Sequence, residues 1–485
     1  MVHNLKLLEK RNWNPGVEVL GVCSDSRRIK QGDVFFACPG PQTDGHQYFE
    51  EAYRRGASVC VGEKLPENVP SQETVFLKVA DSREALTQAL NEFYEFPSRR
   101  MKLIGVTGTN GKTTIAYLIN YLLGKKTPSA YIGTLGSLTP QTSGVLSNTT
   151  PGSEELYSLL GKMMKEGIRT VSLEVSSHAL DQKRVNGLEF ELAVFTQLTP
   201  EHLDYHKSLE EYFQAKRQLF SREPKPKKIL INQDSPYGRR LLGENPKAKS
   251  FSIEGEASYQ AREIATSFSG SEFVLEGPRG SAKFRSPLPM AHNVSNVTAA
   301  LASLDLLGYD PRDFQDALET FPGVPGRLER VEGNGFTVFI DYAHTPDAFE
   351  NILSEARRLS TKRILTLFGC GGDRDPFKRP EMTRIAYQYS DFVILTSDNP
   401  RTEDPSEILR QMRRGLPNGA VPNVLEIADR REAISELLSI AEAGDIVLIL
   451  GKGHEDYQIL GSKKVHFDDR EIVRDLLKRR SRVAL

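Results

Sequence analysis

The chain has 485 residues, enough for about three domains at roughly 150 residues each. Lysine and arginine number 63 against 64 for aspartate and glutamate, so no overall basic charge indicates a nucleic-acid partner. The four cysteines show no C-x-x-C spacing, which argues against a zinc site and a disulfide framework. The first residues lack the apolar core of a signal peptide, and no apolar run reaches membrane-spanning length. These features predict a cytoplasmic protein without membrane insertion.

Residues 1–100 carry short β-like runs separated by turn signals. The runs cover 17–23, 33–38, 58–62 and 75–79, and helical spacing covers 48–55 and 82–94. Polar residues follow the first two runs, among them Ser24, Ser26, Gln42 and Thr43. Taken alone, these are ordinary turn residues.

A glycine-rich stretch follows the apolar run at 102–106. Its residues are Gly108-Thr109-Asn110-Gly111-Lys112-Thr113-Thr114, and helical spacing of apolar residues comes next. Strand, glycine loop and helix together are the context that a phosphate-binding loop requires, because the backbone N–H groups at the helix N-terminus face an anion. Lys112 can reach the β- and γ-phosphates, and the Thr113 hydroxyl can ligate Mg²⁺. The position five residues before Gly111 is Val106, so the loop fits the shorter G-T-N-G-K-T form. It predicts binding of a nucleoside triphosphate.

From 101 to 325 strand and helix patterns alternate, which predicts a parallel sheet with helices on both faces. A strand at 170–175 ends in Glu174, and a strand at 192–196 precedes His202. Ligands of such sheets collect at the carboxyl ends of strands, so we expect both side chains near the phosphate loop. Further patterns predict a strand at 228–232, antiparallel strands within 250–290 and a helix at 291–307.

The stretch 321–326 holds two prolines and two glycines and predicts a domain boundary. Beyond it, the pattern predicts a second doubly wound unit. Its expected strands are 336–341, 363–368, 391–396, 423–427 and 445–450, and its expected helices are 346–359, 380–389, 405–414, 430–442 and 470–479. Polar loops follow four strands, at 341–344, 371–374, 398–401 and 451–455. All four should meet at one edge of the sheet, where a ligand would bind.

Taken in order along the chain, five motifs resemble those of the Mur ligase family. They are the glycine loop 108–114, Glu174-Val175-Ser176-Ser177-His178, His202-Leu203-Asp204-Tyr205-His206, Asp341-Tyr342-Ala343-His344 and Gly451-Lys452-Gly453-His454-Glu455. Within the family, the most similar enzymes are those that add the third residue of the peptidoglycan stem peptide. Asp398-Asn399-Pro400-Arg401 resembles the form that selects meso-diaminopimelate.

The resemblance implies an α/β protein of three domains. These are a UDP-binding domain at 1–100, a central P-loop ATPase domain at 101–325 and a C-terminal Rossmann-like domain at 326–485. It implies an ATP- and Mg²⁺-dependent amide ligase, expected as a monomer. The enzyme would join meso-diaminopimelate to UDP-N-acetylmuramoyl-L-alanyl-D-glutamate through an acyl phosphate.

The resemblance also implies roles for individual residues. Lys112, Glu174, His202 and Lys216 would be catalytic, with Thr113, Glu174, His202 and Lys216 around the metal and Lys216 acting as a carbamate. Read alone, His202 would be a structural histidine and Lys216 a lysine on a helix surface. The nucleotide contacts would be the loop 108–114, Asn293, Asn296, Arg327, Asp341 and His344. The uridine diphosphate pocket would comprise Ser24, Ser26, Gln42 and Thr43, and the muramoyl-dipeptide cradle Asn148, Thr149, Thr150, Ser176, Gln182 and Arg184. Diaminopimelate would contact Arg374, Asp398, Asn399, Pro400, Arg401, Gly451 and Glu455.

Three other interpretations compete with this one. The lysine-adding enzyme of the same family would differ in the amino-acid pocket, where Arg401 favours a substrate with a second carboxylate. Folylpolyglutamate synthase shares the central and C-terminal plan, but a UDP-binding first domain argues against it. A P-loop switch or motor would leave the four C-terminal loops without a function.

Overall fold

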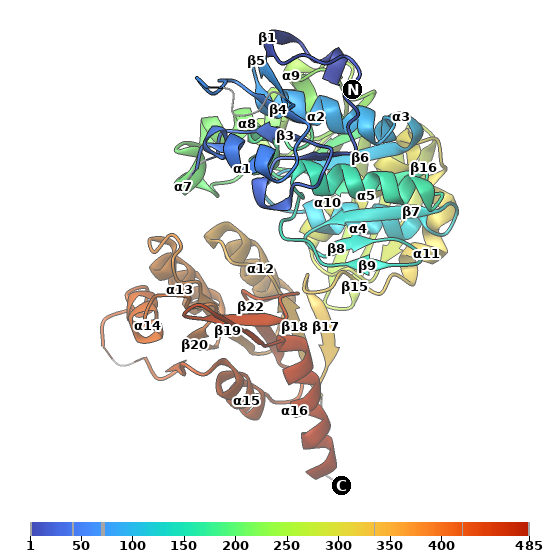
Figure 1. Cartoon of the computed structure of the whole chain (residues 1–485). Helices are drawn as coiled ribbons and strands as arrows, with labels where there is room; N and C mark the ends of the chain where they lie inside the picture. The colour runs from blue at the N-terminus through green and yellow to red at the C-terminus, as the bar shows by residue number, and fades with distance from the viewer. Residues whose placement is uncertain (1, 41–42, 69–72, 334, 420, 484–485) are drawn as a thin grey trace.

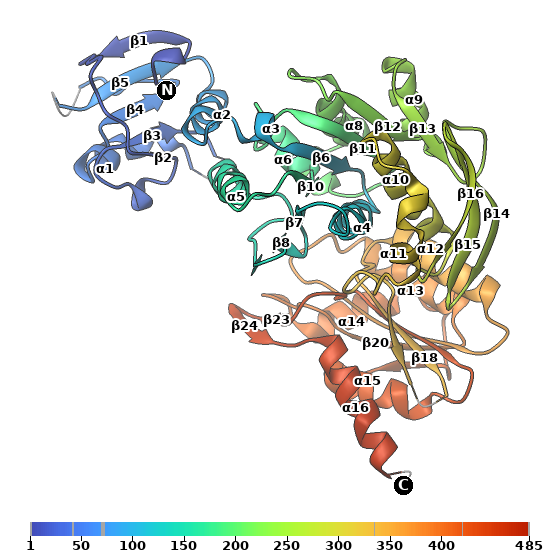
Figure 2. The same ribbon diagram turned by 90° about the vertical axis from the view of Figure 1, so that its right-hand side faces the viewer.

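The computed structural model describes residues 2–40, 43–68, 73–333, 335–419 and 421–483 (Figure 1). They form three units, each built around its own β-sheet, as the sequence predicted. In Figure 2 the first unit lies to one side of the central unit, and the C-terminal unit lies below both. No helix among the described residues is long and apolar enough to cross a membrane.

The first unit has a five-stranded sheet of order β1-β5-β4-β3-β2. Its elements are β1 (Leu7–Arg11), β2 (Gly21–Cys23), β3 (Asp33–Ala37), α1 (Phe49–Arg54), β4 (Val59–Gly62), β5 (Val75–Val79), α2 (Ser82–Phe93) and α3 (Pro97–Arg100). The interior strand β3, between β4 and β2, is buried at every position, which explains its nearly continuous apolar run. The predicted strand at 17–23 is too long, because only 21–23 pair with β3 and Leu20 is 62% exposed.

The sequence did not predict β1. Its residues are mostly exposed, so the run lacks the alternation that marks a half-buried strand. It exists because it pairs with β5 in antiparallel register, a long-range contact that local pattern cannot reveal.

The central unit has an eleven-stranded sheet of order β16-β15-β14-β13-β12-β11-β6-β10-β7-β8-β9. Its strands are β6 (Lys102–Thr107), β7 (Ser129–Gly133), β8 (Gly136–Leu138), β9 (Ser143–Gly144), β10 (Thr170–Glu174), β11 (Phe190–Phe195), β12 (Lys228–Asn232), β13 (Lys249–Ser252), β14 (Tyr259–Ser267), β15 (Gly270–Gly277) and β16 (Gly280–Ser286). The strands from β7 to β14 in this order pair in parallel, and β14, β15 and β16 pair antiparallel, as predicted.

Helices cover both faces of this sheet, again as predicted. They are α4 (Lys112–Leu123), α5 (Ser153–Lys165), α6 (Ser177–Asp181), α7 (Leu203–His206), α8 (Leu209–Ser221), α9 (Pro236–Glu244), α10 (Ala291–Leu306) and α11 (Gln315–Glu319). Successive strand residues point to opposite faces, so Leu103 packs with α5 and α8 while Ile104 packs with α4 and α10. Because parallel strands end at one edge, the residues after β6, β10 and β11 come together there.

The C-terminal unit has a six-stranded sheet of order β17-β18-β22-β19-β20-β21, in which only the pairing of β17 is antiparallel among the described strands. Its elements are β17 (Glu329–Glu332), β18 (Thr337–Asp341), α12 (Pro346–Leu359), β19 (Ile364–Cys370), α13 (Lys378–Tyr389), β20 (Phe392–Ser397), α14 (Pro405–Arg413), β21 (Val424–Glu426), α15 (Arg430–Ile440), β22 (Ile446–Leu450), β23 (Tyr457–Leu460), β24 (Lys463–His466) and α16 (Asp469–Val483). Helices α12, α13 and α14 cover one face, and α15 and α16 cover the other. This confirms the predicted doubly wound unit, to which the structure adds β17 and the hairpin β23–β24.

Candidate active site

A tight glycine loop joins β6 to α4. Gly111 has φ of +87°, and a Cβ added there would lie 2.6 Å from Asn296 Oδ1. A Cβ on Gly108 would lie 1.8 Å from Thr196 Oγ1. Glycine is therefore required at both positions, and the chain can turn tightly into the N-terminus of α4, where backbone N–H groups can bind an anion.

Two lysines meet at the carbonyl of Gly108. Lys112 Nζ donates to the oxygens of Gly108 and Thr109 at 2.9 and 2.7 Å. Lys216 Nζ, from α8, donates to the same Gly108 oxygen at 2.8 Å. Burial lowers the pKa of Lys112, and burial together with the charge of Lys112 lowers the pKa of Lys216 well below its usual range. The two lysines lie beside one another at the phosphate loop.

Glu174 lies under the loop, as predicted from its place at the end of β10. Its side chain is fully buried, and its Oε2 accepts a hydrogen bond from Thr113 Oγ1 at 3.0 Å. Thr134 donates to both carboxylate oxygens, at 2.9 and 3.1 Å, and the Tyr131 hydroxyl also donates. These donors fix the carboxylate beside the Thr113 hydroxyl.

Glu201 joins the two histidines of the site. Its carboxylate lies 3.7 Å from His202 Nε2 and 3.4 Å from His344 Nε2, which belongs to the C-terminal unit. Although burial opposes the change, the hydrogen bond to His344 and the charges of His202 and Lys112 lower the pKa of Glu201 far below its usual range. Burial lowers the pKa of His202 to about 4, so this ring is neutral near pH 7. The sequence did not identify Glu201, although a carboxylate directly before a strand-end histidine was a usable signal.

The two asparagines of α10 are buried and bonded to each other. Asn296 Nδ2 donates to Asn293 Oδ1 at 3.1 Å. At the end of β18, the Asp341 carboxylate accepts from the backbone amides of Leu328 and Ala343 at 2.7 and 2.6 Å. Burial raises the pKa of Asp341, and these two amides oppose the rise.

Polar contacts connect the phosphate loop directly to the C-terminal unit. Arg327 Nη2 donates to Thr113 Oγ1 at 3.2 Å, and its guanidinium lies over the Tyr342 ring, 4.8 Å from the centroid. Asn110 Nδ2 donates to Asp347 Oδ2, at the start of α12, at 3.0 Å. The loop therefore bonds to two different segments of the C-terminal unit.

A cavity of about 490 Å³ lies between the central and C-terminal units. Most of the predicted nucleotide and metal residues line it. They are Thr109, Asn110, Gly111, Lys112, Thr113, Thr114, Glu174, His202, Lys216, Asn293, Asn296, Arg327, Asp341 and His344, together with Thr149 and Ser176 from the predicted cradle. Asn148 is exposed and does not line the cavity.

The rest of the predicted cradle forms a hydrogen-bonded group beside the cavity. The Thr150 hydroxyl donates to the Glu174 carbonyl at 2.7 Å and accepts from the Ser176 amide at 3.0 Å. Arg184 donates to the Thr150 carbonyl at 2.8 Å and to Gln182 Oε1 at 2.7 Å. The cradle is thus bonded to the strand that carries Glu174.

The predicted uridine contacts are less well gathered. The amide and hydroxyl of Ser24 both donate to Glu154, on α5 of the central unit, at 2.5 Å. The Ser26 hydroxyl is buried and donates to a carboxylate on α1. Thr43 is exposed, and Gln42 lies outside the described residues.

The four C-terminal loops bring opposite charges together. Asn399 Nδ2 donates to Glu455 Oε2 at 2.9 Å. Lys452 Nζ lies 3.1 Å from the same Glu455 oxygen and 3.4 Å from Asp398 Oδ1. Gly451, with φ of +111°, turns the chain from β22 into this group. The sequence did not assign a role to Lys452.

Two arginines lie on the same loops, beside Asp398. Arg401 follows the buried Pro400, has φ of +51°, and its Nη1 donates to the Gly372 carbonyl at 2.7 Å. A Cβ on Gly371 would lie 3.0 Å from Arg401 Nη1 and 3.6 Å from Arg374 Cγ, so both arginines flank that glycine.

A phosphate loop, a buried carboxylate beneath it and a cavity closed by a second doubly wound unit define a nucleotide-dependent enzyme of the three-domain α/β class. The sequence matches three family descriptions in order. They are "Mur ligase family, catalytic domain" over 18–94, "Mur ligase middle domain" over 106–304 and "Mur ligase, glutamate ligase domain" over 326–453.

Curated relatives and solved structures agree with these matches. Proteins named UDP-N-acetylmuramoyl-L-alanyl-D-glutamate--2,6-diaminopimelate ligase are similar from Gloeobacter violaceus (44% identical, covering 98% of this chain and 97% of that protein) and Geobacillus kaustophilus (42%, covering 96% of each). A solved structure with the same ligase name has a TM-score of 0.70 at 34% identity and covers 96% of this chain and 95% of that one. A MurF ligase from Thermotoga maritima in complex with ADP has a TM-score of 0.61 at 17% identity, covers 97% of this chain and 99% of that one, and supports the fold alone. The chain belongs to the Mur ligase family.

Proposed function

We propose that this protein is an ATP-dependent ligase that joins meso-diaminopimelate to UDP-N-acetylmuramoyl-L-alanyl-D-glutamate in peptidoglycan precursor synthesis. The observation that carries the proposal is one cavity that combines the phosphate loop, Glu174 and Lys216 in a chain 44% identical to a ligase of that name. We assign substrate binding to 1–100, ATP binding to 101–325 and amino-acid binding to 326–485. We also propose a cytoplasmic monomer, and the four cysteines, all free thiols, suit a reducing compartment.

The residues of the cavity fit a magnesium ion. Thr113 Oγ1 and Glu174 Oε2 are 3.0 Å apart. Neighbouring corners of an octahedron with bonds of about 2.1 Å are also about 3.0 Å apart, so both hard oxygens can serve one Mg²⁺. We assign Thr113 and Glu174 to this ion, and His202 and Lys216 to a second metal position. A bound Mg²⁺ would neutralise charge on the phosphates.

Lys112 and the loop amides carry the electrostatic part of the reaction. A carboxylate is a poor electrophile at neutral pH, so ATP must first convert it to an acyl phosphate, which an amine then attacks. Both steps concentrate negative charge where the loop amides and the Lys112 ammonium point. Lys112 bonds only to the loop's own carbonyls among the described residues, and phosphate oxygens can replace these acceptors without moving another element.

Lys216 suits the proposed carbamate. Carbamate formation requires an uncharged amine, and the lowered pKa of Lys216 supplies that form. The modification replaces a buried neutral amine beside Lys112 with an anionic oxygen ligand. It thereby places a negative charge next to the Lys112 ammonium and adds a donor for the metal.

The remaining assignments concern the amino acid, the nucleoside and the muramoyl-dipeptide. We propose that Arg401 and Arg374 hold the distal carboxylate of diaminopimelate and that Glu455, Asp398 and Asn399 hold its distal ammonium. We assign Asn293 and Asn296 to adenine, and Asp341 to ribose. The cradle from Asn148 to Arg184 would hold the muramoyl-dipeptide, whose carboxylate reacts.

A phosphate-release assay with purified protein tests this function. Release should require ATP, the UDP-dipeptide and meso-diaminopimelate together, and L-lysine should be a poor substitute because it leaves the Arg401 guanidinium unpaired. Equal use of lysine would support the lysine-adding alternative. ATP hydrolysis that needs neither small substrate would support a P-loop switch and would contradict the ligase.

A further inference from the structure

Lys452 is a fully buried cation in the amino-acid site. It follows β22, and its side chain is completely inaccessible to solvent. Its Nζ lies 3.1 Å from Glu455 Oε2, 3.4 Å from Asp398 Oδ1 and 3.5 Å from Asn399 Oδ1. A buried ammonium is costly unless it is paired, and here two carboxylates and an amide surround it.

The contacts of Lys452 determine which carboxylate oxygens remain available. Glu455 Oε2 accepts from both Lys452 and Asn399, whereas Oε1 has the weaker contact, 3.5 Å from the Tyr457 hydroxyl. Asn399 Oδ1 is in turn fixed by the backbone amide of Ile459 at 3.0 Å. The lysine therefore holds one side of Glu455 and leaves the other side to a ligand.

The charges around the site are balanced. The cations are those of Lys452, Arg401 and Arg374, and the carboxylates are those of Asp398 and Glu455, beside Lys452, and of Asp373, beside the two arginines. A distal group that carries both an ammonium and a carboxylate adds no net charge to this set. A distal ammonium alone adds a cation that no carboxylate of the set balances.

We propose that Lys452 is a specificity-determining residue, which positions Glu455 and excludes amino acids whose side chain ends in an ammonium without a carboxylate. This inference rests on the proposed function. Lys452 acts through its charge and through the carboxylates that it holds. Without it, two cations would face three carboxylates, and the distal ammonium of lysine could take the place of the missing positive charge.

The test compares meso-diaminopimelate with L-lysine as substrates of the wild type and of Lys452→Met. The ratio of their kcat/KM values should fall at least tenfold in the variant. The KM for diaminopimelate should rise, and the KM values for ATP and the UDP-dipeptide should stay within twofold. Lys464→Met is the matched control, because Lys464 is an exposed lysine of β24 over the Tyr457 ring, 3.6 Å from its centroid, and should keep the wild-type ratio.

Three outcomes would overturn this inference. They are an unchanged ratio, an equal loss of activity with both amino acids, and a failure of both Lys452→Met and Lys452→Gln to give folded protein by circular dichroism. The glutamine variant keeps a hydrogen-bond donor toward Glu455 and should show a smaller fall in the ratio. A wild type that uses neither amino acid would instead refute the proposed function, which distinguishes the two failures.

Discussion

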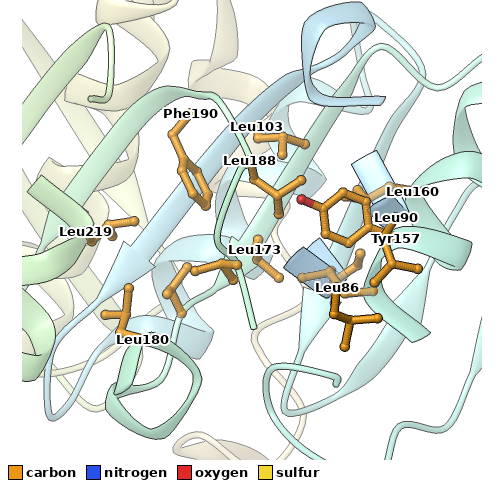
Figure 3. Close-up of a cluster of buried hydrophobic side chains, with 14 of the residues drawn as sticks. Leu86, Leu90, Leu103, Tyr157, Leu160, Leu173, Leu180, Leu188, Phe190 and Leu219 are labelled. Carbon is orange, nitrogen blue, oxygen red and sulfur yellow. The ribbon is translucent and has the colours of Figure 1, made fainter. Parts of the chain in front are cut away.

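The central unit forms two interfaces of opposite chemistry. Toward the first unit, one hydrophobic cluster runs without interruption from α2 through α5 to the central sheet. Figure 3 shows Leu86 and Leu90 of α2 beside Tyr157 and Leu160 of α5. Toward the C-terminal unit, the contacts around the cavity are hydrogen bonds and ion pairs made by the phosphate loop and by Glu201.

This difference indicates which parts respond to a ligand. Apolar burial does not depend on bound nucleotide, so the first and central units should behave as one body. Polar contacts on a phosphate loop change when phosphates arrive, so the position of the C-terminal unit should be coupled to nucleotide binding. An apolar contact remains at the far side of that interface, where Met290 is buried in the C-terminal core and the rings of Phe268 and Phe339 lie 5.7 Å apart.

The largest expected effect is at the phosphate loop itself. Lys112→Ala should lower kcat by about 10³-fold, roughly 4 kcal/mol, because it removes a cation from the charged transition state. Binding of the UDP-dipeptide, which depends on the first interface, should stay within twofold by isothermal titration calorimetry. Near-normal turnover would remove this loop from the mechanism, and lost UDP-dipeptide binding would show that the two sites are not separate.

The apolar interface should respond in stability. Leu90→Ala should lower the free energy of unfolding by about 3 kcal/mol, since a fully buried leucine leaves a cavity. Urea titration followed by circular dichroism measures this, and the loss should be the same with and without ATP. Leu8→Ala is the control, because Leu8 is 65% exposed on β1. A loss below about 1 kcal/mol would mean that the two units are only loosely attached.

The polar interface should respond in nucleotide affinity. Asp347 accepts hydrogen bonds from Asn110 and from Thr199 at 3.0 and 3.2 Å. Asp347→Ala removes both and should raise the KM for ATP about tenfold, roughly 1.4 kcal/mol, while the urea midpoint of the first two units stays unchanged. Asp347→Asn keeps an acceptor oxygen and should show a smaller rise. An unchanged KM for ATP in the alanine variant would mean that contacts from the C-terminal unit do not affect nucleotide binding at the phosphate loop.

The same contrast explains what the sequence could predict. The phosphate loop is contiguous, and the strand-end rule brought Glu174 and His202 to it, so this part of the site followed from local pattern. Glu201 and Lys452 were missed, because their importance depends on partners that lie about 140 and 50 residues away in the chain, such as His344 and Asp398. The C-terminal sheet was predicted nearly strand by strand, since its runs are buried and apolar.

Elements that are defined by long-range pairing could not be predicted from the sequence, for the same reason. The hairpin β23–β24 and strand β17 are short and largely exposed, and pairing with a partner rather than local pattern defines them. Nothing in the turn residues around Ser24 indicated that a carboxylate from α5 would occupy them. The first unit therefore holds the least predictable part of the site.

The smallest expected effect lies at the polar edge of the first interface, where Glu154 accepts from the amide and hydroxyl of Ser24. If Ser24 lies at the diphosphate, the Glu154 charge repels that group. Glu154→Gln should then lower the KM for the UDP-dipeptide about threefold, roughly 0.7 kcal/mol, as expected for one unit charge at a partly buried edge. The gain should shrink as salt rises from 50 to about 500 mM, because ions screen the repulsion. Glu155→Gln, the exposed neighbour on α5, should change the KM by less. An unchanged KM for the UDP-dipeptide in Glu154→Gln at low salt would show that Ser24 does not lie at the diphosphate.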